Sequence, residues 1–187
     1  MWRMAALFIA AFLQTGTLAA DRERPLSVVP SVELARYAGT WYEIARLPNR
    51  FQQHCAGDVT ATYALLPDGQ LQVVNACRTA DGATVRVEGR ARVAEASGPN
   101  SKLEVRFAPA WLGWLPFVWG DYWIIELAAD YSYAVVGAPS REYLWFLARS
   151  PDIDTALYER LAQRAATQGL ELGRLIRTPH ALVPVRK

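Results

Sequence analysis

The residue types best suited to covalent or metal chemistry are scarce in this chain. Its cysteines are Cys55 and Cys77, and its histidines are His54 and His180. Two cysteines so poorly accompanied by histidine are too few to make a structural metal site, so we predict none. Although His54 adjoins Cys55, a loop histidine beside a disulfide is the commoner arrangement. Catalysis would need an activated nucleophile or an acid–base pair, and we expect no catalytic residues and no cofactor.

The first twenty residues have the pattern of a secretory signal. Arg3 gives a short positive region, residues 5–13 are apolar, and residues 15–20 are mostly small, as expected before a cleavage site. The apolar run is too short to span a bilayer. We therefore assign residues 1–20 to a signal peptide, 21–30 to a leader and 31–187 to one folded domain.

Export from the cytoplasm favours a disulfide between the two cysteines. Disulfides persist in oxidising compartments, and an even pair in an exported chain favours a bridge between Cys55 and Cys77. The alternative is a pair of free, buried thiols.

Length and charge narrow the class of protein. A chain of 187 residues suffices for one compact domain. Its 20 basic and 18 acidic residues give a net charge of +2, which is too balanced to predict a nucleic-acid partner. Seven Trp, eight Tyr and six Phe can furnish a large core or the walls of a cavity.

Eight segments are predicted to be strands, because their apolar and polar residues alternate with a period of two. The clearest alternation places Val85 and Val87 opposite Arg86 and Glu88. Eight antiparallel strands joined by short turns close into an up-and-down barrel whose interior admits one small ligand. The predicted strands are 40–46, 59–65, 71–76, 84–93, 102–107, 122–127, 131–137 and 143–148.

Helical signals flank these strands. Residues 32–37 are expected to form one helical turn. After the barrel, apolar residues recur at helical spacing from Ile153, with Ser150 as the expected N-cap and Gly169 at the end. We expect this helix to pack outside the barrel, and the tail at 170–187 to add a short strand.

Three motifs resemble the lipocalin family. Gly39-Thr40-Trp41 heads the first strand, Asp130-Tyr131 lies at the turn between the sixth and seventh strands, and Arg149 ends the last strand. Their order and spacing, with the wording around Trp41 and Arg149, resemble the bacterial lipocalin and apolipoprotein D-like branch over about residues 31–178. The resemblance implies that Gly39, Trp41 and Arg149 are structural. Trp41 would seal the closed end of the barrel, with the Arg149 guanidinium across its ring.

The resemblance also implies a function. Members of this branch bind a lipid-like hydrophobic ligand, such as a fatty acid or lysophospholipid, for transport or storage in the cell envelope. Because no Cys precedes Cys55 to carry a lipid anchor, we expect a soluble periplasmic protein, and outer-membrane association stays open as the alternative. The alternatives are an enzyme on a lipocalin frame, with Glu43 as its inward carboxylate, and a haem or pigment carrier ligated by His54.

An inward Trp41 and Arg149, with the alternation of the other strands, predict which residues line the interior. Apolar walls with a few orienting polar groups are typical of ligand sites, although the same residues could fill a dry core. The predicted ligand-binding residues are Glu43, Ala45, Val59, Ala61, Tyr63, Val73, Asn75, Val87, Val105, Phe107, Tyr143 and Trp145.

The direction of the first strand places both cysteines and the loop after the fifth strand at the mouth. That loop carries Trp111, Trp114, Phe117 and Trp119 and no charge until Asp121. It could fold inward as a plug, or form an apolar lip that touches the ligand or a membrane surface. The expected partners are therefore a small hydrophobic ligand and, for a lip, a membrane surface, on a monomer or homodimer.

Overall fold

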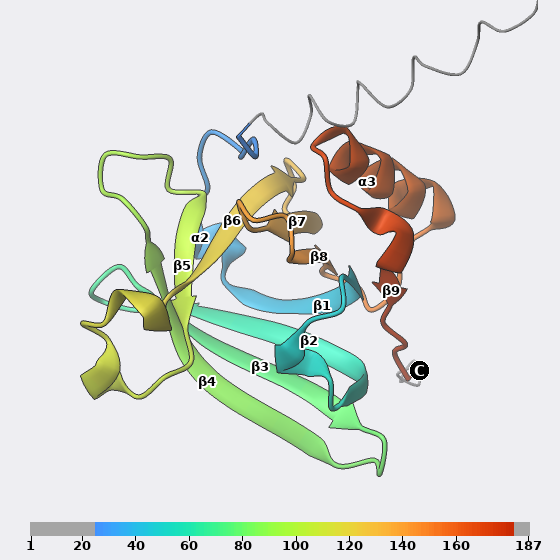
Figure 1. The fold of residues 1–187 in the computed structure, drawn as a ribbon, viewed down its shortest axis with the longest axis horizontal. Helices are drawn as coiled ribbons and strands as arrows, with labels where there is room; N and C mark the ends of the chain where they lie inside the picture. Colours follow the sequence, from blue (N-terminus) through green and yellow to red (C-terminus); the bar gives the residue numbers. More distant parts are fainter. Residues whose placement is uncertain (1–24, 182–187) are drawn as a thin grey trace, which may run out of the picture.

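The computed structural model describes residues 25–181 and folds them around one sheet that closes on itself (Figure 1). The strand order is β2-β3-β4-β5-β6-β7-β8-β1-β9, and a further β2–β1 pairing closes the barrel. The predicted eight-stranded antiparallel barrel is confirmed. The strands are β1 (Gly39–Arg46), β2 (Cys55–Leu65), β3 (Leu71–Thr79), β4 (Thr84–Val93), β5 (Lys102–Arg106), β6 (Gly120–Leu127), β7 (Tyr133–Gly137), β8 (Leu144–Ala148) and β9 (Ile176–Arg177).

Short helices fill the connections. They are α2 (Leu34–Tyr37), α3 (Thr155–Thr167) and the 3₁₀ turns η1 (Arg50–Gln52), η2 (Ala110–Leu112), η3 (Pro116–Val118) and η4 (Leu172–Arg174). Among the described residues, no helix is long and apolar enough to cross a membrane. The predicted signal peptide lies outside the described range.

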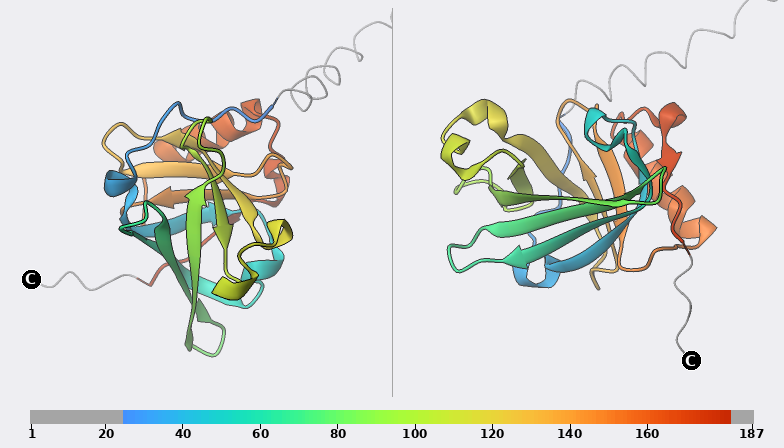
Figure 2. Two further views of the ribbon diagram at one scale, coloured as in Figure 1. Left: turned by 90° about the vertical axis from the view of Figure 1, so that its left-hand side faces the viewer. Right: turned by 90° about the horizontal axis from the view of Figure 1, so that it is seen from below.

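Helix α3 packs on the outer wall of the barrel, as expected (Figures 1 and 2). Its buried residues, Leu161 and Ala165, join a core cluster with Phe146 of β8 and Ile44 of β1. The predicted cap at Ser150 is wrong. Asp154 is the N-cap, because its carboxylate accepts a hydrogen bond from the Leu157 N–H, 2.7 Å away. After α3, the tail forms β9, which pairs with β1.

The closed end of the barrel is held by one arginine. The Arg149 guanidinium carbon lies 3.9 Å from the centre of the Trp41 ring, and Trp41 is fully buried. The same guanidinium donates to the carbonyls of Arg36, Ala38 and Thr40 at 2.8–2.9 Å. These carbonyls belong to the end of α2 and the chain just after it. Cations at a helix C-terminus satisfy carbonyls that have no partner within the helix.

The other two motifs meet at this point. Gly39 has φ +97°, and a Cβ built on it would lie 3.2 Å from the Arg149 guanidinium, so glycine is needed there. Tyr131, in the turn between β6 and β7, accepts a hydrogen bond from the Glu33 N–H and lies under the Arg36 guanidinium. The three motifs therefore hold α2 across the end of the barrel.

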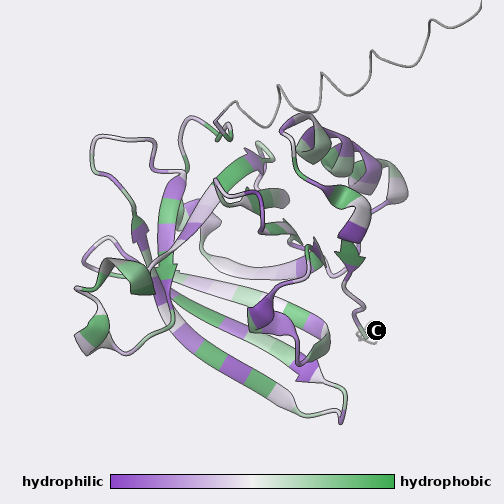
Figure 3. Cartoon of the chain, viewed as in Figure 1, coloured by the Kyte–Doolittle hydropathy of each residue, from purple (hydrophilic) through white to green (hydrophobic). Residues whose placement is uncertain are grey.

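At the opposite end, the β3–β4 hairpin extends beyond the other strands (Figure 2). β4 pairs with β5 only over Arg90–Val93, whereas it pairs with β3 back to Thr84. Hydrophobic and hydrophilic residues alternate along β4 (Figure 3). The alternation predicted for this strand is therefore correct, but the apolar face of the hairpin projects past the barrel wall.

Replacing Arg149 with Ala is expected to lower the free energy of unfolding by about 2–4 kcal/mol, because four backbone carbonyls and the Trp41 ring lose their cation. Urea unfolding followed by tryptophan fluorescence measures this change. The matched control is Arg160→Ala on the exposed face of α3, which should change stability by less than about 0.5 kcal/mol. An Arg149→Ala protein as stable as this control would contradict the structural role.

Candidate functional site

The barrel encloses a cavity of about 500 Å³ that opens at the end opposite α2. This volume falls within the range of about 300–1,000 Å³ that is usual for small-molecule sites. Ten of the twelve predicted ligand-binding residues line the cavity: Glu43, Val59, Ala61, Tyr63, Val73, Asn75, Val105, Phe107, Tyr143 and Trp145.

Ala45 does not line the cavity. Strand β1 has a bulge, because Glu43 pairs with Leu147 and Ala45 pairs with the next residue of β8, Phe146. A bulge adds one residue to one strand, which reverses the facing of the residues beyond it. Ala45 therefore packs in the outer core cluster.

Val87 does not line the cavity either. It pairs with Asn75 on the inner face of the hairpin, but it lies in the part of β4 that has no β5 neighbour. Its side chain is 46% exposed.

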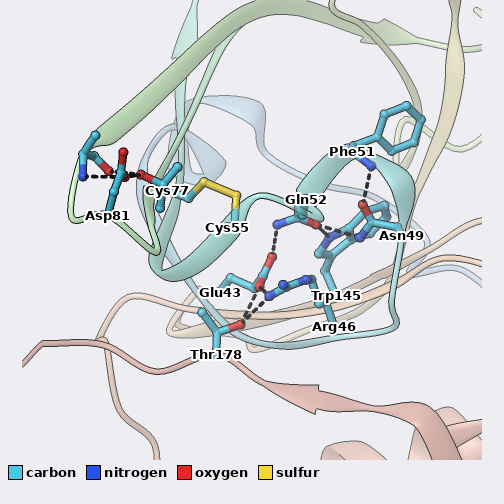
Figure 4. The surroundings of a disulfide bond; sticks show 12 residues. Glu43, Arg46, Asn49, Phe51, Gln52, Cys55, Cys77, Asp81, Trp145 and Thr178 are labelled. Carbon is cyan, nitrogen blue, oxygen red and sulfur yellow. Dashed lines mark hydrogen bonds and ion pairs between the residues drawn. A yellow bond between two sulfur atoms is a disulfide. The ribbon is translucent and has the colours of Figure 1, made fainter.

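The bulge also brings Arg46 to the carboxylate of Glu43. An Arg46 guanidinium nitrogen donates to Glu43 Oε1 at 2.8 Å, and both side chains are buried. Thr178 donates to the same oxygen, and Gln52 donates to Glu43 Oε2 (Figure 4). A buried charge is tolerated when it is paired and hydrogen-bonded in this way. Both carboxylate oxygens are thus engaged by protein donors.

Gln52 fastens the loop between β1 and β2 over the cavity. Its side-chain oxygen accepts hydrogen bonds from Asn49 at 2.8 Å and Trp145 at 2.9 Å (Figure 4). The neighbouring Phe51 and Arg50 line the cavity. The predicted Cys55–Cys77 disulfide is confirmed, and it joins the start of β2 to β3 just after this loop.

Three tyrosines form a hydrogen-bonded chain, and two of them, Tyr63 and Tyr122, line the cavity. The Tyr122 hydroxyl lies 2.8 Å from both the Tyr37 and the Tyr63 hydroxyls. Burial raises the pKa of Tyr63 to about 12. Burial likewise raises the pKa of Tyr37 and of Tyr122 well above the usual value. All three hydroxyls therefore remain protonated at neutral pH.

The tryptophan-rich loop forms a lip and leaves the cavity open. Trp111 and Trp114 are 73% and 79% exposed, and Phe117 is 79% exposed at the edge of the cavity. The Trp119 ring N–H donates to the Gly113 carbonyl, and Arg92, on the outward face of β4, covers the ring at 4.0 Å. The exposed rings extend outward from the mouth.

Neither histidine lines the cavity. His54 is exposed beside the disulfide. The His180 ring Nε2–H donates a hydrogen bond to the backbone carbonyl of Glu43 on the outer side of β1. The predicted haem-ligating position of His54 thus lies outside the cavity walls.

Several residues of the site were not predicted. Arg46 follows Glu43 by three residues, so strict alternation places it on the opposite face, and the bulge has no sequence signal. Gln52 lies in a loop, where periodicity says nothing about facing. The inward facing of Tyr122 could have been predicted from the sequence. It lies two residues from Ile124 on the same face of β6, and it pairs with Leu103 of β5, which also faces inward.

A closed antiparallel barrel with an apolar interior cavity and an external helix defines a class of ligand-binding proteins. The sequence model of the lipocalin-like domain matches residues 32–180, so the chain belongs to the lipocalin-like family. It is 37% identical to temperature-induced lipocalin-1 of Arabidopsis thaliana over 163 residues, covering 87% of each chain. It is also 35% identical to the outer membrane lipoprotein Blc of Escherichia coli K12, covering 92% of this chain and 93% of that protein.

More distant relatives agree with this assignment. Mouse apolipoprotein D is 28% identical, covering 95% of this chain and 96% of that protein. Among solved structures, lobster apocrustacyanin A1 superposes with a TM-score of 0.62 at 16% identity, covering 85% of this chain and 94% of that one. Tobacco hornworm insecticyanin gives a TM-score of 0.64 at 16% identity, covering 85% and 86%. These solved structures share the fold. The expected bacterial lipocalin and apolipoprotein D-like branch is thereby confirmed.

The tyrosine chain makes stability sensitive to alkaline pH. Because the folded-state pKa of Tyr63 is raised to about 12 from 10.0, its contribution is complete below pH 10 and is lost as the pH rises toward 12. An ultraviolet titration should therefore show phenolate from Tyr37, Tyr63 and Tyr122 only as the barrel unfolds. In urea the same tyrosines should ionise near pH 10. Ionisation of all eight tyrosines near pH 10 in a folded barrel would contradict this assignment.

Proposed function

We propose that this protein binds a lipid-like ligand, a fatty acid or a lysophospholipid, and carries or stores it in the cell envelope without covalent chemistry. The observation that carries the proposal is the cavity of about 500 Å³, whose walls include Val59, Val73, Val105 and Trp145. Burial of hydrocarbon contributes roughly 0.8 kcal/mol per CH₂. An acyl chain can therefore be bound in such a cavity without a strong polar contact.

Three charged residues of the described chain line the cavity, Glu43, Arg50 and Asp121, and the cation among them favours an anionic head group at the mouth. Glu43 is an inner carboxylate that is already neutralised by Arg46. Arg50 lines the cavity from the η1 loop and is itself exposed. An anionic head group placed beside Arg50 stays hydrated, whereas one placed deep in the barrel would be desolvated.

Ligand binding without catalysis agrees with the state of the reactive groups. Cys55 and Cys77 are joined, and both oxygens of Glu43 already accept hydrogen bonds from protein donors. An acid–base group must reach the ligand to act. We extend the proposal to location, because Blc, an outer membrane lipoprotein, is similar over 92% of this chain.

The lip of exposed rings supports contact with a lipid surface. Phe117 lines the cavity, and Trp111 and Trp114 are exposed in the same loop. Tryptophan is favoured at membrane–water interfaces. We infer that the mouth rests on a lipid surface when ligand enters or leaves.

Changing Arg50 to Glu should weaken the binding of oleate about three- to tenfold at low salt, because the head group meets a like charge. Isothermal titration calorimetry of delipidated protein measures the affinity. Uncharged monoolein is the control ligand and should bind both proteins alike. If oleate binds the variant as tightly as the parent, the head does not lie at Arg50. If neither lipid binds the parent protein, the proposed function is wrong.

The double variant Trp111→Ser/Trp114→Ser should reduce vesicle binding at least tenfold, because two interfacial side chains are lost. Sedimentation with anionic phospholipid vesicles measures this, and oleate affinity should stay unchanged because neither ring lines the cavity. The matched control is Leu65→Ser/Ile176→Ser, which removes exposed apolar side chains elsewhere. Vesicle binding that survives the tryptophan changes would refute the lip.

A further inference from the structure

Asn75 is a polar residue in the apolar wall of the cavity. It faces Ala61 across β2 and Val87 across β4, and its inward neighbour along β3 is Val73. Its side-chain oxygen is buried and accepts no hydrogen bond within the described structure. A buried acceptor without a partner is costly to keep. The residue lines the cavity, so a bound molecule can supply the missing donor.

Two other polar side chains of the cavity, Glu43 and Gln52, differ from Asn75 because protein groups satisfy them. Glu43 is bound by Arg46, Thr178 and Gln52. Gln52 is in turn bound by Asn49 and Trp145. The Asn75 side-chain oxygen therefore takes no part in the hydrogen-bond network that fastens the loop over the cavity.

A second polar group lies on the same wall. Tyr63 faces Val73, so it is the diagonal neighbour of Asn75 on the inner surface of β2 and β3. Three hydroxyl protons serve the two hydrogen bonds of the Tyr37–Tyr122–Tyr63 chain. One hydroxyl proton is therefore not used within the chain. The two hydrogen bonds can be donated in three ways, and in two of them the unused proton is on Tyr63 or Tyr122, which line the cavity.

We propose that Asn75 and the Tyr63–Tyr122 pair form a subsite for a hydroxyl group on the buried hydrocarbon of the ligand, so that the protein selects a hydroxylated acyl chain over a plain one. This inference rests on the proposed lipid-binding function and specifies its ligand. A hydroxyl donates to the orphan oxygen and accepts from the spare tyrosine proton. An ammonium or carboxylate does not fit, because it would be desolvated between valines.

The shape of the wall suits a substituent. Ala61, directly opposite Asn75, is small and lies between the larger Val59 and Tyr63 on the same face of β2. Asn75 is two residues along β3 from Cys77, or about 7 Å from the disulfide at the mouth. The hydroxyl therefore belongs on the part of the chain nearer the head group.

The test compares stearic acid with a series of hydroxystearic acids that differ in the hydroxyl position, by calorimetry on the delipidated protein. We expect stearate to bind and one position toward the head to bind about three- to tenfold tighter, the gain from one hydrogen bond. In Asn75→Leu this preference should vanish, with stearate still bound. In Tyr63→Phe the preference should fall in part.

Two controls separate the subsite from general damage. Asn75→Leu removes an unsatisfied buried group, so the ligand-free variant should resist urea as well as the parent protein or better. Val59→Leu alters the same wall without touching an amide, and should keep the preference for the hydroxylated chain.

If stearate binds and no hydroxylated chain binds tighter, or if Asn75→Leu keeps the preference, the subsite is refuted and the lipid-binding function stands. If no member of the series binds the parent protein, both are refuted.

Discussion

The barrel depends on the contact between Arg149 and the closed end. One guanidinium covers the Trp41 ring and binds carbonyls at and just after the end of α2. Without the Arg149 guanidinium, the carbonyls at the end of α2 would lose their hydrogen-bond donor and the Trp41 ring would lose its cover. Because α2 is only four residues long, it has little stability of its own. Its position is therefore set by Arg149, Trp41 and Tyr131, and the barrel is closed at that end alone.

Closure at one end determines what the other end can do. The chain from Trp41 toward Arg46 runs from the sealed floor to the mouth, and the η1 loop, the disulfide and the tryptophan lip all gather there. The buried carboxylate in the cavity wall, Glu43, is paired with Arg46 before any ligand arrives. The interior can then stay mainly apolar, which favours hydrocarbon, while the few unsatisfied hydrogen-bonding groups remain available to a ligand.

Much of this architecture follows from the sequence, for identifiable reasons. Period-two alternation is long and clear in β2, β3 and β4, and the Gly39, Tyr131 and Arg149 motifs identify the family. The failures occur where a local rule is overridden. A bulge reverses Ala45 and Arg46, and the early end of β5 leaves Val87 facing inward but beyond the wall. Neither change has a residue signature, since both depend on how neighbouring strands are paired.

The tryptophan loop shows how far pattern alone can go. Its composition predicts an unusual apolar segment, but a plug and a lip have the same sequence. The structure separates them through Trp119, whose ring is held by the Gly113 carbonyl and by Arg92 on the outward face of β4, so this ring does not plug the barrel. With one ring anchored, Trp111 and Trp114 extend outward at the rim. Exposed aromatic surface is costly in water, so its concentration beside an open apolar cavity argues that both serve the same hydrophobic ligand path.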